Sequence, residues 1–167
     1  KDFYAIDFGT SNSLLSYVSP DFPEGKLVEL DKSNGPILKS LIYTPNQSEW
    51  YFGEEAIHER EENDGEGRFF RSIKKFLAEP NFKGTEVHGK IMSIEVLVSK
   101  ILKHMKTVAD KKLSKNVDNV VLGRPARYSL DDECDSLAQK RMYDAAKLAG
   151  FKNIIFCPEP LAAGLNV

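Results

Sequence analysis

The chain has 167 residues, of which 41% are hydrophobic and 29% are charged. This length suits about one domain with a sizeable core, and the composition excludes a collagen, a disordered chain and a disulfide-rich mini-protein. Lysine and arginine total 23 against 25 acidic residues, so the net charge of −2 gives no overall attraction to nucleic acid or to an anionic membrane. No apolar run approaches the roughly 18 residues of a membrane-spanning helix. Cys134 and Cys157 have no metal-ligand spacing, and we expect reduced thiols in a cytoplasmic protein.

The first residues of the chain predict antiparallel strands. Residues 3–7 and 14–18 are short apolar runs, and only residues 8–13 separate them, so the two should form a β-hairpin. A third strand is predicted at residues 26–30, after a proline- and glycine-containing turn signal at residues 20–25.

The middle of the chain has a different texture. Residues 37–43 and 50–52 are expected to be extended, and a charged helix is expected to begin at Gly53. Residues 68–77 predict a short helix that ends before Pro80.

The second half predicts an alternation of helices and strands. Apolar residues recur at three- and four-residue steps over residues 94–116, with Ser93 as a candidate N-cap, which makes this the clearest helix. The elements predicted after it are a strand at 119–122, a helix at 131–149 ended by Gly150, a strand at 153–156 and a helix from Pro160. A strand–helix–strand succession is normally a parallel unit.

Residues 7–13 are the first of three stretches suited to chemistry. Asp7 ends a buried strand, and the turn that follows contains Gly9, Thr10, Ser11 and Asn12. Glycine lets a backbone approach a ligand closely, and successive N–H groups in a tight turn can form an anion-binding concavity. Asp7 would suit a hydrated Mg²⁺ beside bound phosphates. The same residue types also make ordinary polar hairpin turns, so this stretch alone leaves both interpretations open.

Two further stretches follow the later strands. Residues 123–127 (Gly-Arg-Pro-Ala-Arg) lie where ligands gather in α/β sheets, although a plain strand-to-helix connection explains them as well. Glu159 lies between two prolines at a predicted helix start, where a carboxylate could orient a water molecule or simply favour the helix dipole. The phosphate motifs G-x-x-x-x-G-K-[ST] and G-x-G-x-x-G do not occur.

Together and in this order, the three stretches resemble motifs of the actin-like ATPase superfamily. Asp7-Phe8-Gly9-Thr10-Ser11-Asn12-Ser13 looks like the first phosphate motif of the seventy-kilodalton heat-shock chaperones of the DnaK type. Residues 120–126 look like the family's strand that ends in a proline, and residues 159–165 look like its E-P-x-A-A connecting motif. The Gly-Arg-Pro version, with residues 69–74 and 149–151, is similar to the YegD-like branch.

The resemblance implies a fold, cofactors and site residues. The fold would be an α/β, ribonuclease-H-like lobe with an inserted α+β subdomain. Residues 1–33 and 113–167 would form the main subdomain, and residues 34–112 the inserted one. ATP or ADP would bind with Mg²⁺: Gly9, Thr10, Ser11 and Asn12 would cradle the phosphates, Asp7 would bind Mg²⁺ through water, and Glu159 would position the attacking water. Pro125 would belong to the region that passes the nucleotide signal to a peptide-binding domain.

The sequence departs from the family pattern at one position. The family's phosphate-side lysine follows an alanine in a G-x-x-A-K pattern, whereas here Ala56 is followed by Ile57. Lys74 and Arg71 are the candidates to substitute, and hydrolysis by the full-length protein stays open.

The resemblance covers only the first lobe, so we expect this chain to be part of a longer protein and to bind ATP weakly or not at all alone. The expected partners are ATP, the remaining ATPase lobe, and client polypeptides or co-chaperones, with neither nucleic acid nor membrane. Two alternatives remain. An actin-fold sugar or acetate-type kinase would need a substrate-base aspartate that residues 123–125 do not offer. A non-hydrolysing nucleotide-binding or filament-forming relative is favoured somewhat by Ile57.

Overall fold

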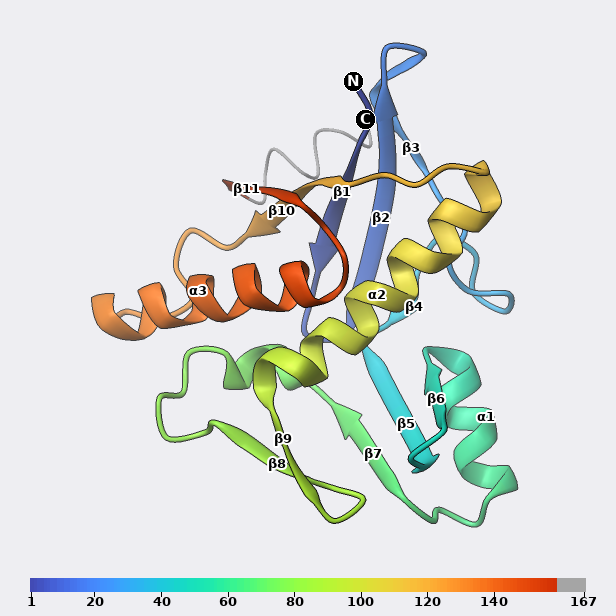
Figure 1. The fold of residues 1–167 in the computed structure, drawn as a ribbon, viewed down its shortest axis with the longest axis vertical. Helices are drawn as coiled ribbons and strands as arrows, with labels where there is room; N and C mark the ends of the chain where they lie inside the picture. Colours follow the sequence, from blue (N-terminus) through green and yellow to red (C-terminus); the bar gives the residue numbers. More distant parts are fainter. Residues whose placement is uncertain (159–167) are drawn as a thin grey trace.

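The largest unit of the molecule is a mixed sheet of six strands (Figure 1). The computed structural model describes residues 1–158, so the predicted helix from Pro160 and the candidate Glu159 lie outside the described residues. The strand order is β11-β10-β1-β2-β3, and β4 pairs separately with β2. These strands are β1 (Phe3–Phe8), β2 (Asn12–Ser19), β3 (Phe22–Leu27), β4 (Leu38–Lys39), β10 (Asn119–Arg124) and β11 (Asn153–Pro158).

The predicted hairpin is confirmed. β1 and β2 pair antiparallel from Phe3 opposite Val18 to Phe8 opposite Ser13. The third strand was predicted too late, because β3 already begins at Phe22 and includes Pro23. β3 is an edge strand, where a residue without an N–H is tolerated, so the proline does not mark a turn here.

Three strands run parallel and end at one edge of the sheet. β1 pairs parallel with β10, and β10 pairs parallel with β11, as the strand–helix–strand pattern predicts. Ile6, Leu122 and Phe156 occupy one row across these strands. The turn after β1 and the loop after β10 therefore leave the sheet at the same edge, although more than 100 residues separate them in the chain.

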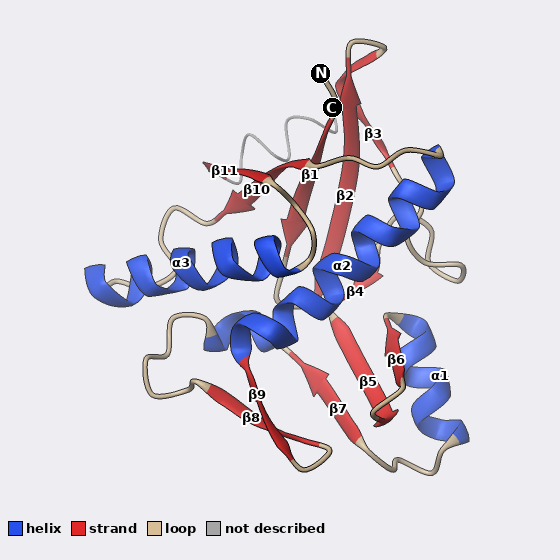
Figure 2. Cartoon of the chain, viewed as in Figure 1, coloured by secondary structure: helices blue, strands red, loops and turns tan. Residues whose placement is uncertain are grey.

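Two long helices pack against each other and against the large sheet (Figure 2). They are α2 (Ile94–Leu113) and α3 (Asp132–Leu148). The predicted N-cap Ser93 accepts a hydrogen bond from the N–H of Val96. α2 ends three residues before the predicted end, because Ser114 has a left-handed backbone. The residues of α2 and α3 that fill the core are fully or almost fully buried: Ile94, Leu97, Val98, Ile101, Leu102, Met105, Ala138, Met142 and Ala145.

A second, three-stranded sheet lies below the first in Figure 1 and has the order β6-β5-β7. Its strands are β5 (Leu41–Asn46), β6 (Glu49–Phe52) and β7 (Arg68–Arg71), and the helix α1 (Glu54–Glu62) packs on it. The single helix predicted for residues 68–77 is wrong. Residues 68–71 pair with β5 instead, and Ser72, with a left-handed backbone, leads into a 3₁₀ turn at Ile73–Phe76. Tertiary strand pairing has overridden the local pattern.

A small hairpin completes the fold and was not predicted. β8 (Gly84–Val87) and β9 (Lys90–Ser93) pair antiparallel through a turn in which both His88 and Gly89 have positive φ angles. A type I′ hairpin turn requires positive φ values at both central residues, and a histidine–glycine pair is a weak sequence signal for such a turn. The helix α2, which follows, contacts both halves of the molecule: His104 stacks on Phe52 of the small sheet, while Asp110 accepts a hydrogen bond from Tyr4 of the large one.

Candidate functional site

The turn between β1 and β2 is closed tightly on itself. The N–H of Gly9 donates to the carbonyl oxygen of Asn12 over 2.9 Å. A Cβ atom on Gly9 would lie 2.5 Å from that same oxygen, which is closer than real contacts allow. Only glycine therefore fits this position without moving the backbone.

A serine from another part of the chain braces this turn. The N–H of Ser40 donates to the carbonyl of Ser11, and the Ser40 hydroxyl donates to the carbonyl of Gly9, both over 2.8 Å. The hydroxyls of Ser13 and Ser40 are also hydrogen-bonded, over 2.8 Å, and both residues are buried. Sequence analysis missed Ser40, because nothing in its own segment shows that it meets a turn some 30 residues earlier.

The braced turn has two backbone donors without a partner in the described part of the chain. The carbonyls of Gly9, Ser11 and Asn12 all accept hydrogen bonds from within the fold. The amides of Thr10 and Ser11, by contrast, donate to no atom in residues 1–158, and both residues are exposed. Adjacent backbone N–H groups without partners, beside fixed carbonyls, form a site that suits an anion.

The turn forms one end of a cleft of about 530 Å³. α1 contributes one wall, with residues spaced three and four positions apart on one helical face. The end of β7 and the neighbouring strand contribute the opposite wall. The residues that line the cleft are Thr10, Ser11, Asn12, Lys39, Leu41, Ile57, Arg60, Glu61, Phe69, Arg71 and Ser72.

The cleft brings together several residues that the sequence analysis named separately. Thr10, Ser11 and Asn12 line it, as does Ile57, where the family resemblance led us to expect a lysine, and so does Arg71, one of the two proposed substitutes. Lys39 and Arg60, which no motif indicated, line it too. The cationic side chains come from three different elements, so no local pattern could have grouped them.

Asp7 is the residue predicted to hold a divalent cation. It is half-buried near the end of β1, opposite Leu14 of β2 and two residues before Gly9. Among residues 1–158 there is no group of three or more His, Cys, Asp and Glu side chains that could hold a metal directly. A single half-buried carboxylate such as Asp7 suits a cation that keeps most of its waters and touches few carboxylates, which is how Mg²⁺ usually binds.

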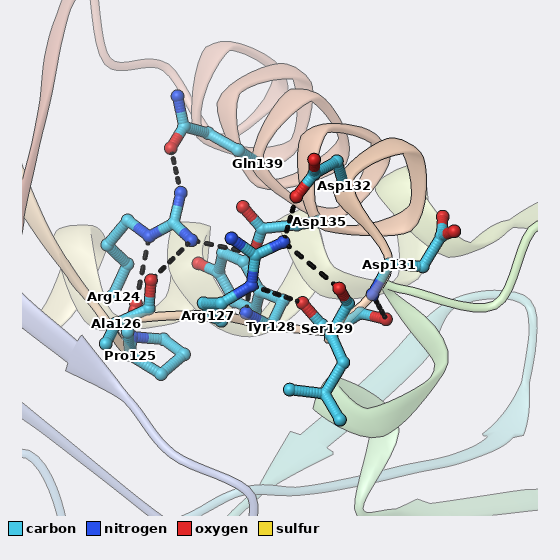
Figure 3. A network of polar contacts seen from close by, with 11 residues as sticks. Arg124, Pro125, Ala126, Arg127, Tyr128, Ser129, Asp131, Asp132, Asp135 and Gln139 are labelled. Atoms are coloured by element: carbon cyan, nitrogen blue, oxygen red, sulfur yellow. Dashed lines mark hydrogen bonds and ion pairs between the residues drawn. The ribbon is translucent and has the colours of Figure 1, made fainter.

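The loop after β10 is built differently (Figure 3). The Arg124 guanidinium donates to the carbonyls of Pro125 and Ala126, and on α3 it donates to Gln139 and forms a 2.8 Å ion pair with Asp135. Asp135 also accepts the N–H of Tyr128 over 2.6 Å. One arginine and one carboxylate thus tie the loop to the helix that follows.

A second arginine closes the far part of the same loop. Arg127 donates to the carbonyls of Ser129 and Leu130 and pairs with Asp132 at the start of α3 (Figure 3). The N–H of Tyr128, together with the Arg124 charge, lowers the pKa of Asp135. Because the carbonyls and guanidiniums of this loop satisfy one another, the loop is suited to holding strand and helix in place.

The molecule thus combines a mixed α/β fold with a turn, at the end of its first strand, in which two backbone amides have no partner in residues 1–158. A family model described as "Hsp70 protein" matches residues 72–166, more than half of the chain. The chain belongs to the Hsp70 family.

Curated relatives agree over almost the whole chain. The chaperone protein DnaK of Mycoplasmopsis pulmonis (strain UAB CTIP) is 29% identical over 161 residues, which cover 96% of this chain and 24% of that protein. DnaK of Metamycoplasma hominis is 28% identical over 99% of this chain and 25% of its own length. A chaperone protein HscA homolog of Mannheimia succiniciproducens is 25% identical over 96% of this chain and 27% of its own length. The chain therefore spans about a quarter of the length of these relatives.

No helix within residues 1–158 is both long and apolar enough to cross a membrane.

Proposed function

We propose that this chain is the first lobe of a chaperone-like ATPase and that the β1–β2 turn holds the phosphates of ATP or ADP. The observation that carries the proposal is the pair of amides of Thr10 and Ser11, which have no partner in residues 1–158, in a turn where the carbonyls of Gly9, Ser11 and Asn12 accept hydrogen bonds. Negatively charged phosphate oxygens are the natural partners of such donors. Membership of the Hsp70 family supports the same assignment.

Each of the predicted site residues has a role in this proposal. Gly9 allows the turn to close, and Thr10, Ser11 and Asn12 cradle the β- and γ-phosphates with their amides and side chains. Asp7 holds Mg²⁺ through its waters, and the ion would neutralise charge on the phosphates during in-line transfer to water. Glu159 positions the attacking water, a role that follows from the resemblance of residues 159–165 to the family's connecting motif.

We also propose that this lobe has a ribonuclease-H-like fold and belongs to the YegD-like branch of the family. The strand order β3-β2-β1-β10-β11, with β2 antiparallel to the three parallel strands, supports a ribonuclease-H-like lobe. Residues 1–33 and 113–167 would form the main subdomain of this lobe, with residues 34–112 inserted. The Gly123-Arg124-Pro125 sequence supports the YegD-like branch, and client polypeptides or co-chaperones would be the partners of the longer protein.

The test is single-turnover hydrolysis of ATP by the full-length protein, with and without Mg²⁺. Release of phosphate that requires Mg²⁺, and that Asp7→Asn abolishes, is the expected result. Transfer of the phosphate to a sugar or to acetate instead of water would favour the kinase alternative and contradict the proposal.

One observation favours a second candidate, binding without turnover. Ile57 lines the cleft where the family has a lysine, so one catalytic charge is missing from that position. Tight ATP binding with no phosphate release in a single turnover would support this candidate. For the 167-residue chain alone, we expect weak or undetectable ATP binding, and a micromolar affinity by isothermal titration would contradict that expectation.

A further inference from the structure

Two arginines face the anion-binding turn from the walls of the cleft. Arg60 comes from α1, which also presents Ile57 to the cleft one turn earlier. Arg71 is the last residue of β7. The family resemblance leads us to expect a lysine at Ile57, whose side chain is apolar. Arg71, already a candidate substitute, and Arg60, which no motif indicates, line the same cleft.

Strand pairing directs Arg71 into the cleft. Arg71 lies directly opposite Leu41 in the β5–β7 pair, and cross-strand partners project from the same face of a sheet. Phe69, two residues earlier on β7, projects from that face as well. Leu41, Phe69 and Arg71 accordingly all line the cleft. Lys74, the other proposed substitute, lies in the 3₁₀ turn beyond Ser72 and is not one of the lining residues.

The two guanidiniums share one aromatic ring. Arg60 lies 4.5 Å and Arg71 5.5 Å from the centre of the Phe69 ring. Stacking on a ring holds a planar guanidinium in place while leaving the N–H donors at its edge available.

Neither arginine has a carboxylate partner within the described part of the chain. Arg60 and Arg71 form no ion pair and donate no side-chain hydrogen bond to any residue in 1–158. Lys39, the remaining cation of the cleft, pairs with Glu54 over 2.6 Å, which offsets its charge. Glu61 is the acidic residue among those that line the cleft. It is exposed and lies in the last turn of α1. Two like charges close to one ring repel each other, and an anion bound between them would offset this repulsion.

We propose that Arg60 and Arg71 bind the phosphate end of the nucleotide and so supply the positive charge that Ile57 does not. The inference rests on the proposed function in the same cleft and names the residues that recognise the ligand's phosphates. A guanidinium presents paired N–H donors that match two oxygens of one phosphate, which a single lysine cannot do.

Inorganic tripolyphosphate tests the inference without adenosine and without the second lobe. The 167-residue chain is titrated with tripolyphosphate while the backbone amides and the arginine side-chain N–H groups are followed by nuclear magnetic resonance. We expect saturable shifts at the amides of Thr10 and Ser11 and at the Nε–H of Arg60 and Arg71. Arg71→Gln and Arg60→Gln should each weaken binding by about 10-fold or more, the typical effect of losing a hydrogen bond to a charged group.

The control variants separate a charge effect from a specific contact. Lys75→Gln removes one positive charge from an exposed residue outside the cleft, so it should leave the affinity within about twofold of the original. Arg71→Lys keeps the charge but not the paired donors and should fall between the original chain and Arg71→Gln. The circular dichroism and thermal midpoint of Arg71→Lys should match those of the unsubstituted chain, since Arg71 is exposed.

The outcomes distinguish this inference from the proposed function. If the Thr10 and Ser11 amides respond but the arginine variants bind as well as the Lys75→Gln control, the arginine assignment is wrong and the phosphate turn stands. If even millimolar tripolyphosphate, at which weak binding would still shift the resonances, moves neither the turn amides nor the arginines, both are overturned.

Discussion

Two loops leave the same edge of the large sheet, and they are braced in different ways. In the β1–β2 turn, Ser40 and the Gly9 amide donate to the carbonyls of Gly9, Ser11 and Asn12, and the amides of Thr10 and Ser11 have no partner in residues 1–158. The loop after β10 turns its carbonyls toward the guanidiniums of Arg124 and Arg127 and anchors them to α3. Both loops have backbone amides without a partner in residues 1–158, those of Thr10 and Ser11 in the turn and those of Ala126 and Arg127 in the loop after β10. The loops differ in their bracing, because a buried serine of a distant segment holds the turn whereas charged side chains hold the other loop.

This difference in bracing is why we propose the turn, and not the loop after β10, as the binding site. A loop needs bracing that consumes its acceptors without consuming its donors, so that an anion finds N–H groups already oriented. The β1–β2 turn obtains this bracing from a buried serine of a distant segment. The loop after β10 uses the side chains of Arg124 and Arg127 for internal contacts, and these contacts make it a rigid link between β10 and α3.

Gly9→Ala should have the largest effect, and it tests the difference between the β1–β2 turn and the loop after β10 most directly. The added Cβ would lie 2.5 Å from the Asn12 carbonyl, so the turn must open. We expect tripolyphosphate binding to weaken by about 10-fold or more and the free energy of unfolding to fall by about 1–3 kcal/mol. Titration and thermal melts measure both. Gly65→Ala, at a position where nothing lies within 4 Å of the added atom, should cost about 1 kcal/mol and leave anion binding intact.

Ser40→Ala tests the brace. It leaves the Gly9 carbonyl without its side-chain donor and the buried Ser13 hydroxyl without its partner. The expected loss is about 1–3 kcal/mol of unfolding free energy, measured by denaturant titration, together with weaker tripolyphosphate binding. Ser99→Ala is the matched control, because Ser99 is also buried but bonds only to the Val96 carbonyl of its own helix. Equal behaviour of the two serine variants would contradict the brace.

Arg124→Gln should affect stability and leave the anion site alone. The substitution removes the link between the loop carbonyls and α3, so we expect the thermal midpoint to fall by roughly 3 °C or more. Tripolyphosphate affinity should not change. Arg127→Gln, whose side chain is more exposed, should lower the midpoint less. A loss of anion binding in Arg124→Gln would mean that the two loops are not independent.

Asp135→Asn should have the smallest effect, visible mainly as a change in acid sensitivity. The pKa of Asp135 is lowered in the fold by the Tyr128 N–H and by Arg124. Its ionised form therefore stabilises the fold above the unfolded pKa of about 3.9, and this contribution is lost as the pH falls through the folded pKa. The asparagine variant should be less stable at pH 7 and should lose less stability below about pH 4. If the expectation is wrong, plots of thermal midpoint against pH will run parallel for Asp135→Asn and the unsubstituted chain.

Much of the fold was predictable because it depends on local periodicity. The apolar stripe from Ile94 to Met105 defined α2, and the short spacing between residues 7 and 14 defined the first hairpin. The wrong or missing secondary-structure predictions have a common cause. Residues 68–77 read locally as a helix, but residues 68–71 gain ladder hydrogen bonds from β5 that no local pattern contains. The β8–β9 hairpin turns on His88 and Gly89, whose backbone angles a sequence signals only weakly.

The sequence by itself determined the turn chemistry of residues 7–13, the order of the three motifs and the absence of a lysine after Ala56, because all of these are properties of consecutive residues. The tertiary structure alone decided which groups meet at the turn. Ser40 reaches it through the short β2–β4 pairing, and Arg60 and Arg71 face it from a helix and from the end of a strand. Such convergence depends on strand register and helix packing between distant segments, and these are settled only when the whole core forms.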